Sequence, residues 1–329
     1  MSHLRTPPPA PRHPARARRH DTGLAAHKLV TVYRLEGQRA PYATMGFAGF
    51  TAALAGLSGA GITVSEANLD NGAVGFNGLA WPLRLRRILA LATDLGSAKA
   101  LWAATDNTAA FNFLLGSAGE PGALALETCN GTTEFFDGAP PAAGGAAAVE
   151  ARSSFTCASG KAYDGVNCSL WWPGAPAPLP LGAPLADAVF RSNHALHPAV
   201  MATQEPLWND TVSRYLLLGE RLREAAAAGK DAAGAGAGAG AGGMGAEAAV
   251  NVTSLLGIKG PDYGSCEASN FAQLKPHASA IVLSVTYDPS RQTAYVAWED
   301  GTGKDWSPAS CNTYVQFDFA KWFAKKEDY

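Results

Sequence analysis

Long apolar runs and an excess of charge of one sign are both absent from this sequence. No stretch of about 18 consecutive apolar residues occurs, so no membrane-spanning helix is predicted. Only 16% of the 329 residues are charged and the formal net charge is −2, which gives no electrostatic basis for binding nucleic acid. The hydrophobic fraction of 47% is that of a globular chain, and a chain of about 300 residues buries about three quarters of its unfolded surface.

Cysteine is also scarce, with five in the chain: Cys129, Cys157, Cys168, Cys266 and Cys311. None shows CxxC spacing, so no zinc site is predicted, and no organic cofactor is indicated. An odd number in an oxidising compartment favours two disulfides and one free thiol. A Cys157–Cys168 bridge would close a short loop and a Cys266–Cys311 bridge a long one, but the sequence alone leaves the pairing open.

The N-terminus lacks the apolar segment of a secretory signal. Residues 1–28 contain five prolines and six Lys or Arg against the single acid Asp21. Proline at this density forbids a stable helix, so we expect residues 1–27 to be a disordered tail or a mis-joined gene start. A transit peptide is the alternative, and the prolines and the scarcity of serine count against it.

Asparagine sits in four glycosylation sequons, at Asn130, Asn167, Asn209 and Asn251. With twelve asparagines in the chain, roughly one or two sequons are expected by chance. The excess favours a secreted or lysosomal glycoprotein, and coincidence in a chain rich in Ala, Gly and Ser is the alternative.

Hydrophobic periodicity predicts a layered α+β domain over residues 28–329. Alternation predicts strands at 28–35, 62–69, 280–288, 293–299 and 312–319, with a short buried strand at 123–128. Helices are expected from Pro82 to Ala92, from a cap at Ser97 to Ala104, and over 208–224. Residues 43–61 are punctuated by glycine, residues 138–188 have the composition of a surface loop, and the Ala-Gly tract at 225–245 predicts a flexible insertion.

Several stretches, in order, resemble the group of choloylglycine hydrolases, acid ceramidases and penicillin acyltransferases. Residues 56–69 (GLSGAGITVSEANL) resemble its G-M-N-x-x-G-(L/I)-x-V-x-x-x-N strand, residues 191–194 (RSNH) its T-N-H segment, and residues 211–215 (TVSRY) the start of its S-x-R-(F/Y) helix. Residues 284–289, 295–299 and 306–312 look most like an acid-ceramidase-like, acyltransferase-like branch. The likeness extends over about residues 28–323.

The resemblance implies the four-layer αββα sandwich of N-terminal-nucleophile hydrolases. In that group a precursor cleaves itself before a cysteine, and the freed α-amino group, whose reference pKa is about 7.7–8.0, acts as base for its own thiol. The thiolate then attacks an amide carbonyl to form an acyl-enzyme, which water or an amine resolves. The expected substrate is a small N-acyl amide or a lipid amide, such as a bile-salt amide, a ceramide, a fatty-acid ethanolamide or a penicillin precursor.

Three residues match site positions of the group. Asn68 matches an asparagine beside the nucleophile, Asn193 an asparagine that contributes to the oxyanion hole, and Arg214 an arginine that favours the thiolate. Each also has a structural interpretation: Asn68 as a strand end, Asn193 as a loop anchor and Arg214 as a helix-surface charge. His194 does not correspond to a catalytic base of the group, and a loop histidine is more often structural.

The nucleophile is where the sequence departs from the group. The resemblance places the cysteine, and a second strand carrying an arginine and an aspartate, upstream of residue 28, where this sequence has the Pro/Arg-rich tail. No cysteine precedes Cys129, and the counterpart of Cys129 in the group is not a nucleophile. We therefore expect the missing segment, or a separate subunit, to belong to the gene product.

Three hypotheses follow. The first is an amide hydrolase or acyltransferase whose N-terminal segment is missing from this chain, so that the chain alone is inactive. The second is a non-catalytic glycoprotein that binds a lipid or acyl amide in the same cleft. The third is a folding-defective remnant with exposed sheet edges. Trp81, Trp171 and Trp172 are candidates for lining an acyl pocket, although a tryptophan is more often part of a core.

Overall fold

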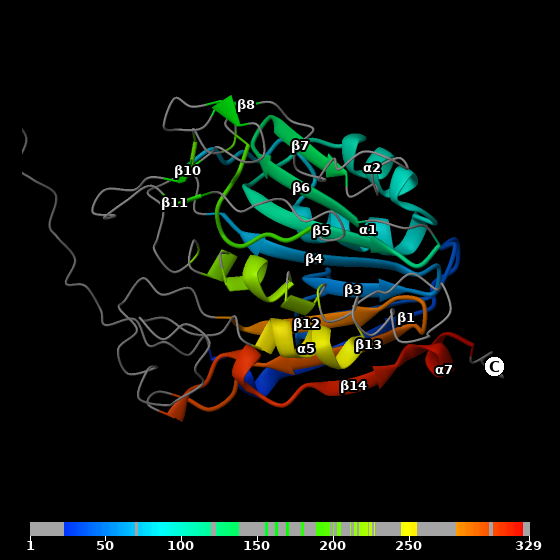
Figure 1. Ribbon diagram of the computed structural model, residues 1–329. Coiled ribbons are helices and arrows are strands. Elements are labelled where there is room, and N and C mark those ends of the chain that lie inside the picture. Colours follow the sequence, from blue (N-terminus) through cyan, green and yellow to red (C-terminus); the bar gives the residue numbers. More distant parts are fainter. Residues whose placement is uncertain are drawn as a thin grey trace, which may run out of the picture.

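The computed structural model describes residues 23–69, 72–119, 123–137, 189–197, 245–254, 281–302 and 305–324, with shorter pieces between 155 and 227. Its largest element is a seven-stranded antiparallel sheet in which the strands follow one another in sequence order (Figure 1). The strands are β1 Lys28–Tyr33, β2 Tyr42–Phe47, β3 Ala55–Ser58, β4 Ile62–Asn68, β5 Phe111–Ser117, β6 Ala123–Cys129 and β7 Thr132–Asp137. The chain is α+β with a large antiparallel sheet, as the sequence predicts.

Two helices inserted between β4 and β5 cover one face of this sheet, α1 Trp81–Leu91 and α2 Leu95–Ala103. The predicted apolar stripe of α1 is confirmed, since Leu85, Ile88 and Leu89 are buried in one cluster with residues of β4 and β5. The predicted cap of α2 was wrong by three residues. Asp94 is the N-cap and accepts from the Ser97 backbone N–H at 2.6 Å, while the Ser97 hydroxyl accepts from the Asp94 N–H, which makes a capping box.

A three-stranded antiparallel sheet packs on the opposite face of the large one. It consists of β12 Leu283–Asp288, β13 Thr293–Trp298 and β14 Val315–Asp318, in that order. Met45 and Leu57 from the large sheet share a buried cluster with Val296 and Trp298 from β13. The Tyr287 hydroxyl donates to the Val64 carbonyl at 3.0 Å and so ties the two sheets together.

The outer face of the small sheet is covered by α5 Ala246–Ser254, which contacts β12. Thr253 on the helix and Thr286 on β12 are hydrogen-bonded through their hydroxyls at 3.0 Å. Leu283, Val285 and Tyr287 alternate with Thr286 and pack in the cluster between the two sheets, so β12 presents opposite faces to α5 and to the large sheet. Short elements among the described residues include η1 Ala25–His27, η5 Ala309–Cys311 and α7 Phe319–Ala324.

Some local predictions fall outside the described residues or were wrong. The segment 138–188, expected to be loop, contains two short antiparallel pairs, β8 Phe155–Thr156 with β9 Ala162–Tyr163 and β10 Ser169–Leu170 with β11 Leu179–Pro180. Residues 1–22, and most of the Ala-Gly tract at 225–245, lie outside the described residues. Trp171 and Trp172 are also outside the described residues. Trp81 packs against Phe111 with ring centroids 4.4 Å apart.

Only some of the sequon asparagines and cysteines lie among the described residues, and the glycosylation they suggest stays a prediction. Asn130, in the turn between β6 and β7, and Asn251, on α5, are exposed, while Asn167 and Asn209 lie outside the described residues. Cys311 is disulfide-bonded and Cys129 is free. Because Cys157, Cys168 and Cys266 are outside the described residues, the pairing stays a prediction.

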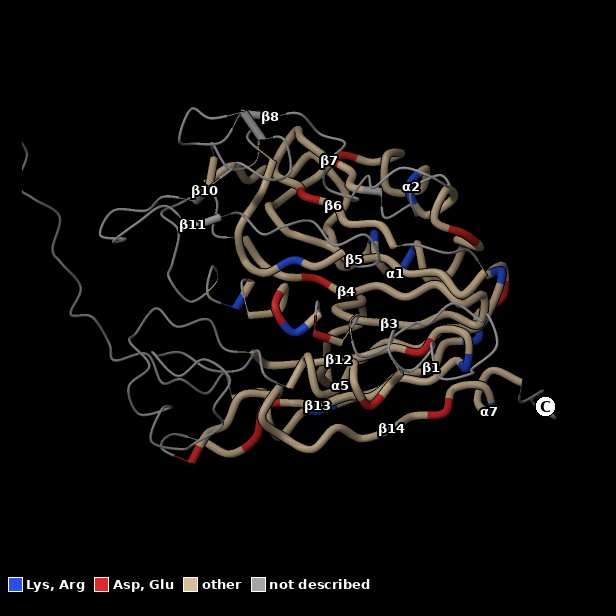
Figure 2. The backbone as a smooth tube through the Cα atoms, in the orientation of Figure 1, with Lys and Arg blue, Asp and Glu red and all other residues tan. Residues whose placement is uncertain are grey.

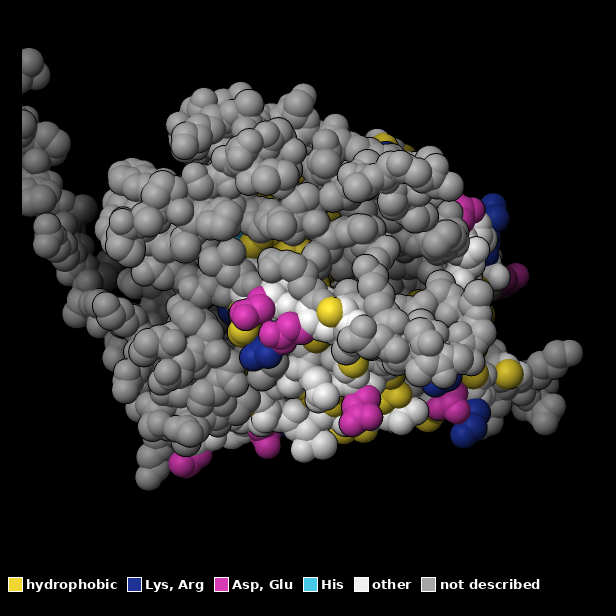
Figure 3. Space-filling view, in the orientation of Figure 1, with side chains coloured by type: hydrophobic (Ala, Val, Ile, Leu, Met, Phe, Trp, Pro, Cys, Tyr) yellow, Lys and Arg dark blue, Asp and Glu magenta, His cyan; other side chains and the backbone are white. Residues whose placement is uncertain are grey.

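Charged residues are dispersed along the described backbone, and acidic and basic side chains lie beside one another on the face in Figure 3 (Figures 2 and 3). An example is the exposed Arg221–Glu224 pair at 2.7 Å. Within the described part of the chain, no helix is both long and apolar enough to cross a membrane.

Gly56 allows α1 to approach the sheet closely, and we expect Gly56→Ala to lower the free energy of unfolding by about 1–3 kcal/mol. A Cβ atom built at Gly56 would lie 2.3 Å from Leu89 Cδ1 and 2.8 Å from the Ala43 carbonyl oxygen, and the carbonyl belongs to backbone that cannot rotate away. Urea unfolding measures the effect. The control is Gly119→Ala, whose Cβ would meet nothing closer than 4.0 Å, and an equal loss in both variants would contradict the packing argument.

Candidate active site

The three residues predicted for the site come from distant parts of the sequence and meet at one end of β4. Asn68 is the last residue of β4 and is exposed. Asn193 lies at a bend in the irregular segment 189–197, and Arg214 lies in a helical stretch that includes residues 217–222. The helix predicted over 208–224 is thus present at its described positions.

A chain of hydrogen bonds joins the three residues. The Asn193 side-chain Nδ2 donates to the Asn68 carbonyl oxygen at 2.7 Å. Arg214 Nη2 donates to Asn193 Oδ1 at 2.9 Å. The contacts bridge 125 and 21 residues of sequence, so they depend on the fold and not on local turn geometry.

These contacts fix the orientation of the Asn193 carboxamide. A guanidinium can only donate, so the atom that faces Arg214 must be the carboxamide oxygen, and the atom that faces the Asn68 carbonyl must be the nitrogen. One of the two N–H bonds of that nitrogen is used by Asn68, and the contact lies at an exposed position. The second N–H is held in a fixed direction and, among the described residues, no hydrogen-bond partner for it is seen.

Such a donor has the properties of one arm of an oxyanion hole. A fixed N–H stabilises negative charge that develops on a carbonyl oxygen in the transition state, because no reorganisation is needed at that moment. The positive charge of Arg214, bound to the other end of the same amide, polarises the carboxamide in the direction that strengthens its N–H groups as donors.

His194, beside Asn193, has no role as an acid or base in this arrangement. Its side chain is 1% exposed, and Nδ1 lies 3.1 Å from the Ser192 hydroxyl and 3.0 Å from the Thr211 hydroxyl. Burial, followed by the charges of Arg191 and Arg214, lowers the pKa of His194 to about 3. The ring is therefore neutral at physiological pH and has no surface for a substrate, which agrees with its structural interpretation.

Cys129 is close to the site but is enclosed. It is 2% exposed and packs in an apolar cluster with Leu69, Ala110, Ala195 and Val200. A thiol attacks only what can reach it, and these side chains shield the sulfur from an incoming carbonyl. This placement agrees with the expectation that Cys129 is not the nucleophile.

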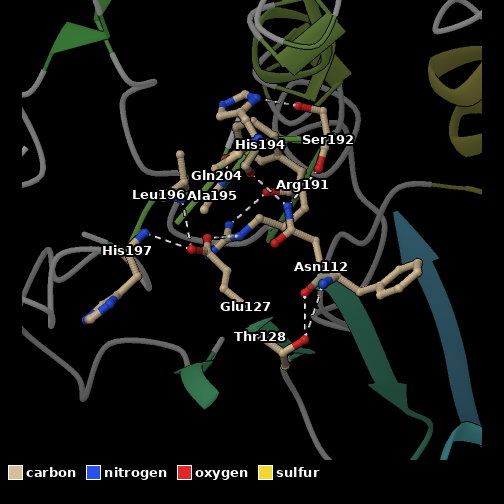
Figure 4. Close-up of polar contacts among 12 residues, drawn as sticks. Asn112, Glu127, Thr128, Arg191, Ser192, His194, Ala195, Leu196, His197 and Gln204 are labelled. Atoms are coloured by element: carbon tan, nitrogen blue, oxygen red, sulfur yellow. Dashed lines mark hydrogen bonds and ion pairs between the residues drawn. The ribbon is translucent and has the colours of Figure 1, made fainter. Parts of the chain in front are cut away.

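The sequence analysis did not predict a buried polar cluster formed by Asn112, Glu127 and Arg191, which contacts the segment 191–197 (Figure 4). Glu127 is fully buried, and its Oε1 lies 2.9 Å from Arg191 Nε. One signal was available: Glu127 is a carboxylate in the apolar strand predicted at 123–128, and a buried charge needs a partner.

Acidic, histidine and cysteine side chains do not gather into a metal site in the described part of the chain. No group of three or more such side chains there could hold a metal ion. The polar groups that Asn193 and Arg214 bring to the described site are amide and guanidinium donors.

No model of a known protein family matches the sequence, and no detectably similar protein is found among curated ones. Among solved structures, a Caenorhabditis elegans ortholog of N-acylethanolamine-hydrolyzing acid amidase matches 35% of this chain with a TM-score of 0.28 and 10% identity. That match covers 53% of the worm protein, so the chain spans about half of its length.

Two variants of the conjugated bile acid hydrolase from Clostridium perfringens also match. The TM-scores are 0.46 and 0.45, the identities 9% and 10%, and each match covers 86% of this chain and 78% of the hydrolase. At these scores and identities the likenesses establish neither a family nor an activity for this chain.

Proposed function

We propose that this chain is the scaffold of an amide hydrolase or acyltransferase that acts on non-peptide C–N bonds through a cysteine acyl-enzyme. The observation that carries the proposal is the hydrogen-bonded chain from Arg214 through Asn193 to Asn68. Three residues from separate motifs are thereby joined, with Asn193 contacting both of the others.

The packing of the fold supports the same proposal. α1 and α2, the seven-stranded sheet, the three-stranded sheet and α5 follow one another as layers. This order is compatible with the αββα sandwich that the motif resemblance implies. Asn68 and Asn193 lie where β4 ends, and edges at which strands end are common sites for catalytic groups.

In the proposed mechanism, the substrate carbonyl oxygen accepts the second N–H of Asn193. A cysteine thiolate forms a bond to the carbonyl carbon, and the electron pair of the C=O bond moves to the oxygen that Asn193 stabilises. Collapse expels the amine, which takes up a proton, and leaves a thioester. Water then releases the acid, or an acceptor amine forms a new amide. The resemblance places that cysteine upstream of residue 28, in a segment that packs against this site.

The proposal is tested by binding and by hydrolysis. The 329-residue chain is expected to bind N-lauroylethanolamine, and the gene product that starts at an upstream cysteine is expected to hydrolyse it in a reaction that iodoacetamide abolishes. Binding in both without hydrolysis in either would favour a non-catalytic acyl-amide-binding protein. If the protein neither bound nor hydrolysed any of N-lauroylethanolamine, a bile-salt amide, a ceramide and penicillin V, the proposal would be overturned.

Asn193→Ala is expected to weaken binding of N-lauroylethanolamine by about tenfold in the 329-residue chain, which is the worth of one good hydrogen bond. In the cysteine-bearing protein it is expected to lower the hydrolysis rate by about 10²–10³, the effect of losing one oxyanion donor. Calorimetry and a steady-state assay measure the two effects. Asn251→Ala on α5 is the matched control, and equal effects from the two asparagines would contradict the role of Asn193.

A further inference from the structure

Two buried polar residues lie directly beneath the segment that carries Asn193. Asn112 on β5 and Glu127 on β6 are register partners on adjacent strands, so their side chains emerge from the same face of the sheet. They are 1% and 0% exposed. Both point at the backbone of residues 191–197 (Figure 4).

Asn112 binds the carbonyl groups of the two residues that flank Asn193. Its Nδ2 donates to the Ser192 carbonyl oxygen at 2.7 Å and to the His194 carbonyl oxygen at 2.8 Å. Both donors of one side-chain nitrogen are thereby spent on the two carbonyls that flank Asn193 in the chain. The backbone of Asn193 cannot rotate without breaking one of them.

Glu127 fixes the two ends of the same segment. Its Oε1 forms an ion pair with Arg191 Nε at 2.9 Å. Its Oε2 accepts from the backbone N–H groups of Leu196 at 2.8 Å and His197 at 2.7 Å. One carboxylate thus holds the residue two before Asn193 and the residues three and four after it.

One further side chain restrains the backbone of Asn193. Gln204 Nε2 donates to the Asn193 carbonyl oxygen at 3.2 Å, while its Oε1 accepts from the Ala195 N–H at 2.9 Å. We interpret these contacts as fixing the position of the segment 191–197 more than as stabilising the fold. Replacing a buried ion pair by apolar side chains of similar volume is often neutral or stabilising, so stability alone does not require this pair.

We propose that Asn112 and Glu127 are positioning residues for the Asn193 carboxamide. They hold the segment 191–197 so that the Asn193 N–H groups keep one direction, with Arg191 as the counter-ion of Glu127. The proposal rests on the proposed function in one respect: it assigns the positioned donor to an oxyanion. The positioning itself is a property of the folded chain.

The test measures hydrogen exchange of the Asn193 side-chain amide by NMR in the 329-residue chain, with the signal assigned by its loss in Asn193→Asp. Glu127→Gln and Asn112→Leu are each expected to speed exchange by about tenfold or more, because the bond to the Asn68 carbonyl opens more often. If Glu127→Gln does not fold, Glu127→Gln/Arg191→Met removes both charges together and takes its place.

Two control variants distinguish a loss of positioning of the Asn193 amide from a general loss of stability of the fold. Glu134→Gln removes a carboxylate that is the register partner of Glu127 on β7 and lies 3.5 Å from the side chain, not the backbone, of His197. Leu89→Ala destabilises α1 on the other face of the sheet. Both are expected to leave the exchange of the Asn193 amide within about twofold of the wild-type rate at a pH where the protein is fully folded.

The outcomes are distinct. Unchanged Asn193 exchange in Glu127→Gln, or in the double variant, and in Asn112→Leu would overturn the positioning proposal and leave the proposed function standing. Faster exchange in Leu89→Ala to the same degree would also overturn it. A wild-type chain that shows the expected exchange pattern but binds no N-acyl amide would leave the positioning intact and contradict the proposed function.

Discussion

Replacing Glu66 by glutamine is expected to raise the free energy of unfolding by about 3 kcal/mol at about pH 8 and to change it little at about pH 4. Glu66 lies on β4, directly across from Phe113 on β5, in a part of the sheet where Trp81 and Phe111 also pack. The residue as a whole retains some exposure, but its Oε2 is buried and has no hydrogen-bond partner among the described residues.

Burial without a partner explains the direction. Desolvation disfavours the charged carboxylate and raises the pKa of Glu66 from 4.5 to about 7. The folded chain therefore holds this proton more tightly than the unfolded chain does. The tighter binding of this proton stabilises the folded chain fully below about pH 4.5, and this stabilisation is lost as the pH rises to about 7. The shift in pKa corresponds to about 3 kcal/mol in the free energy of unfolding.

Urea unfolding at several pH values measures the effect, and glutamine is the suitable replacement because it resembles the protonated acid in shape. Glu36→Gln, which also removes one carboxylate but at an exposed position, is the control. If the free energies of unfolding of Glu66→Gln and wild type changed in parallel from about pH 4 to about pH 8, the argument from burial would be wrong.

The elements that the sequence predicts well are those whose apolar residues recur at a regular spacing. β4 and the hairpin of β12 and β13 alternate in the sequence, and α1 has a clean helical stripe. β2 was missed because all six of its residues are buried, on one side by α1 and on the other by β13, so no alternation exists to read. β3 was missed because Gly56 and its short length resemble a glycine-rich turn.

The site divides in the same way. Asn68, Asn193 and Arg214 could be chosen from motifs because each motif is local. The residues that hold them could not, since the contacts of Glu127 with Leu196 and His197 span 69 and 70 residues and those of Asn112 span 80 and 82. The sequence shows that Glu127 is an unusual residue for a buried strand, but it does not show which backbone segment the carboxylate binds.

The pH dependence of stability caused by His194 is expected to have the opposite sign to that caused by Glu66. A substitution at His194 isolates this second large effect. In the folded chain, burial and the charges of Arg191 and Arg214 lower the pKa of His194 from 6.5 to about 3, so the unfolded chain binds this proton more tightly. The stabilising effect is complete above about pH 6.5 and is lost as the pH falls, and the loss approaches about 4 kcal/mol near pH 3.5.

His194→Asn tests this, because asparagine can keep a polar contact with Ser192 and Thr211 but does not titrate in this range. The variant is expected to be less stable than wild type at about pH 7, where it loses packing of the ring against Tyr215, and to lose far less stability on acidification. If urea unfolding showed the same loss of stability on acidification for variant and wild type, protonation of His194 would not destabilise the folded chain, and the argument would be wrong.

Between about pH 4.5 and 6.5 the two effects overlap with opposite sign, because acidification stabilises the chain through Glu66 and destabilises it through His194. The wild-type chain is therefore expected to show a nearly flat profile there, which by itself would suggest that neither group matters. Each single variant is expected to expose a slope, falling toward acid in Glu66→Gln and rising toward acid in His194→Asn. The double variant is expected to lack both of these slopes, since the two residues do not contact each other and their contributions add.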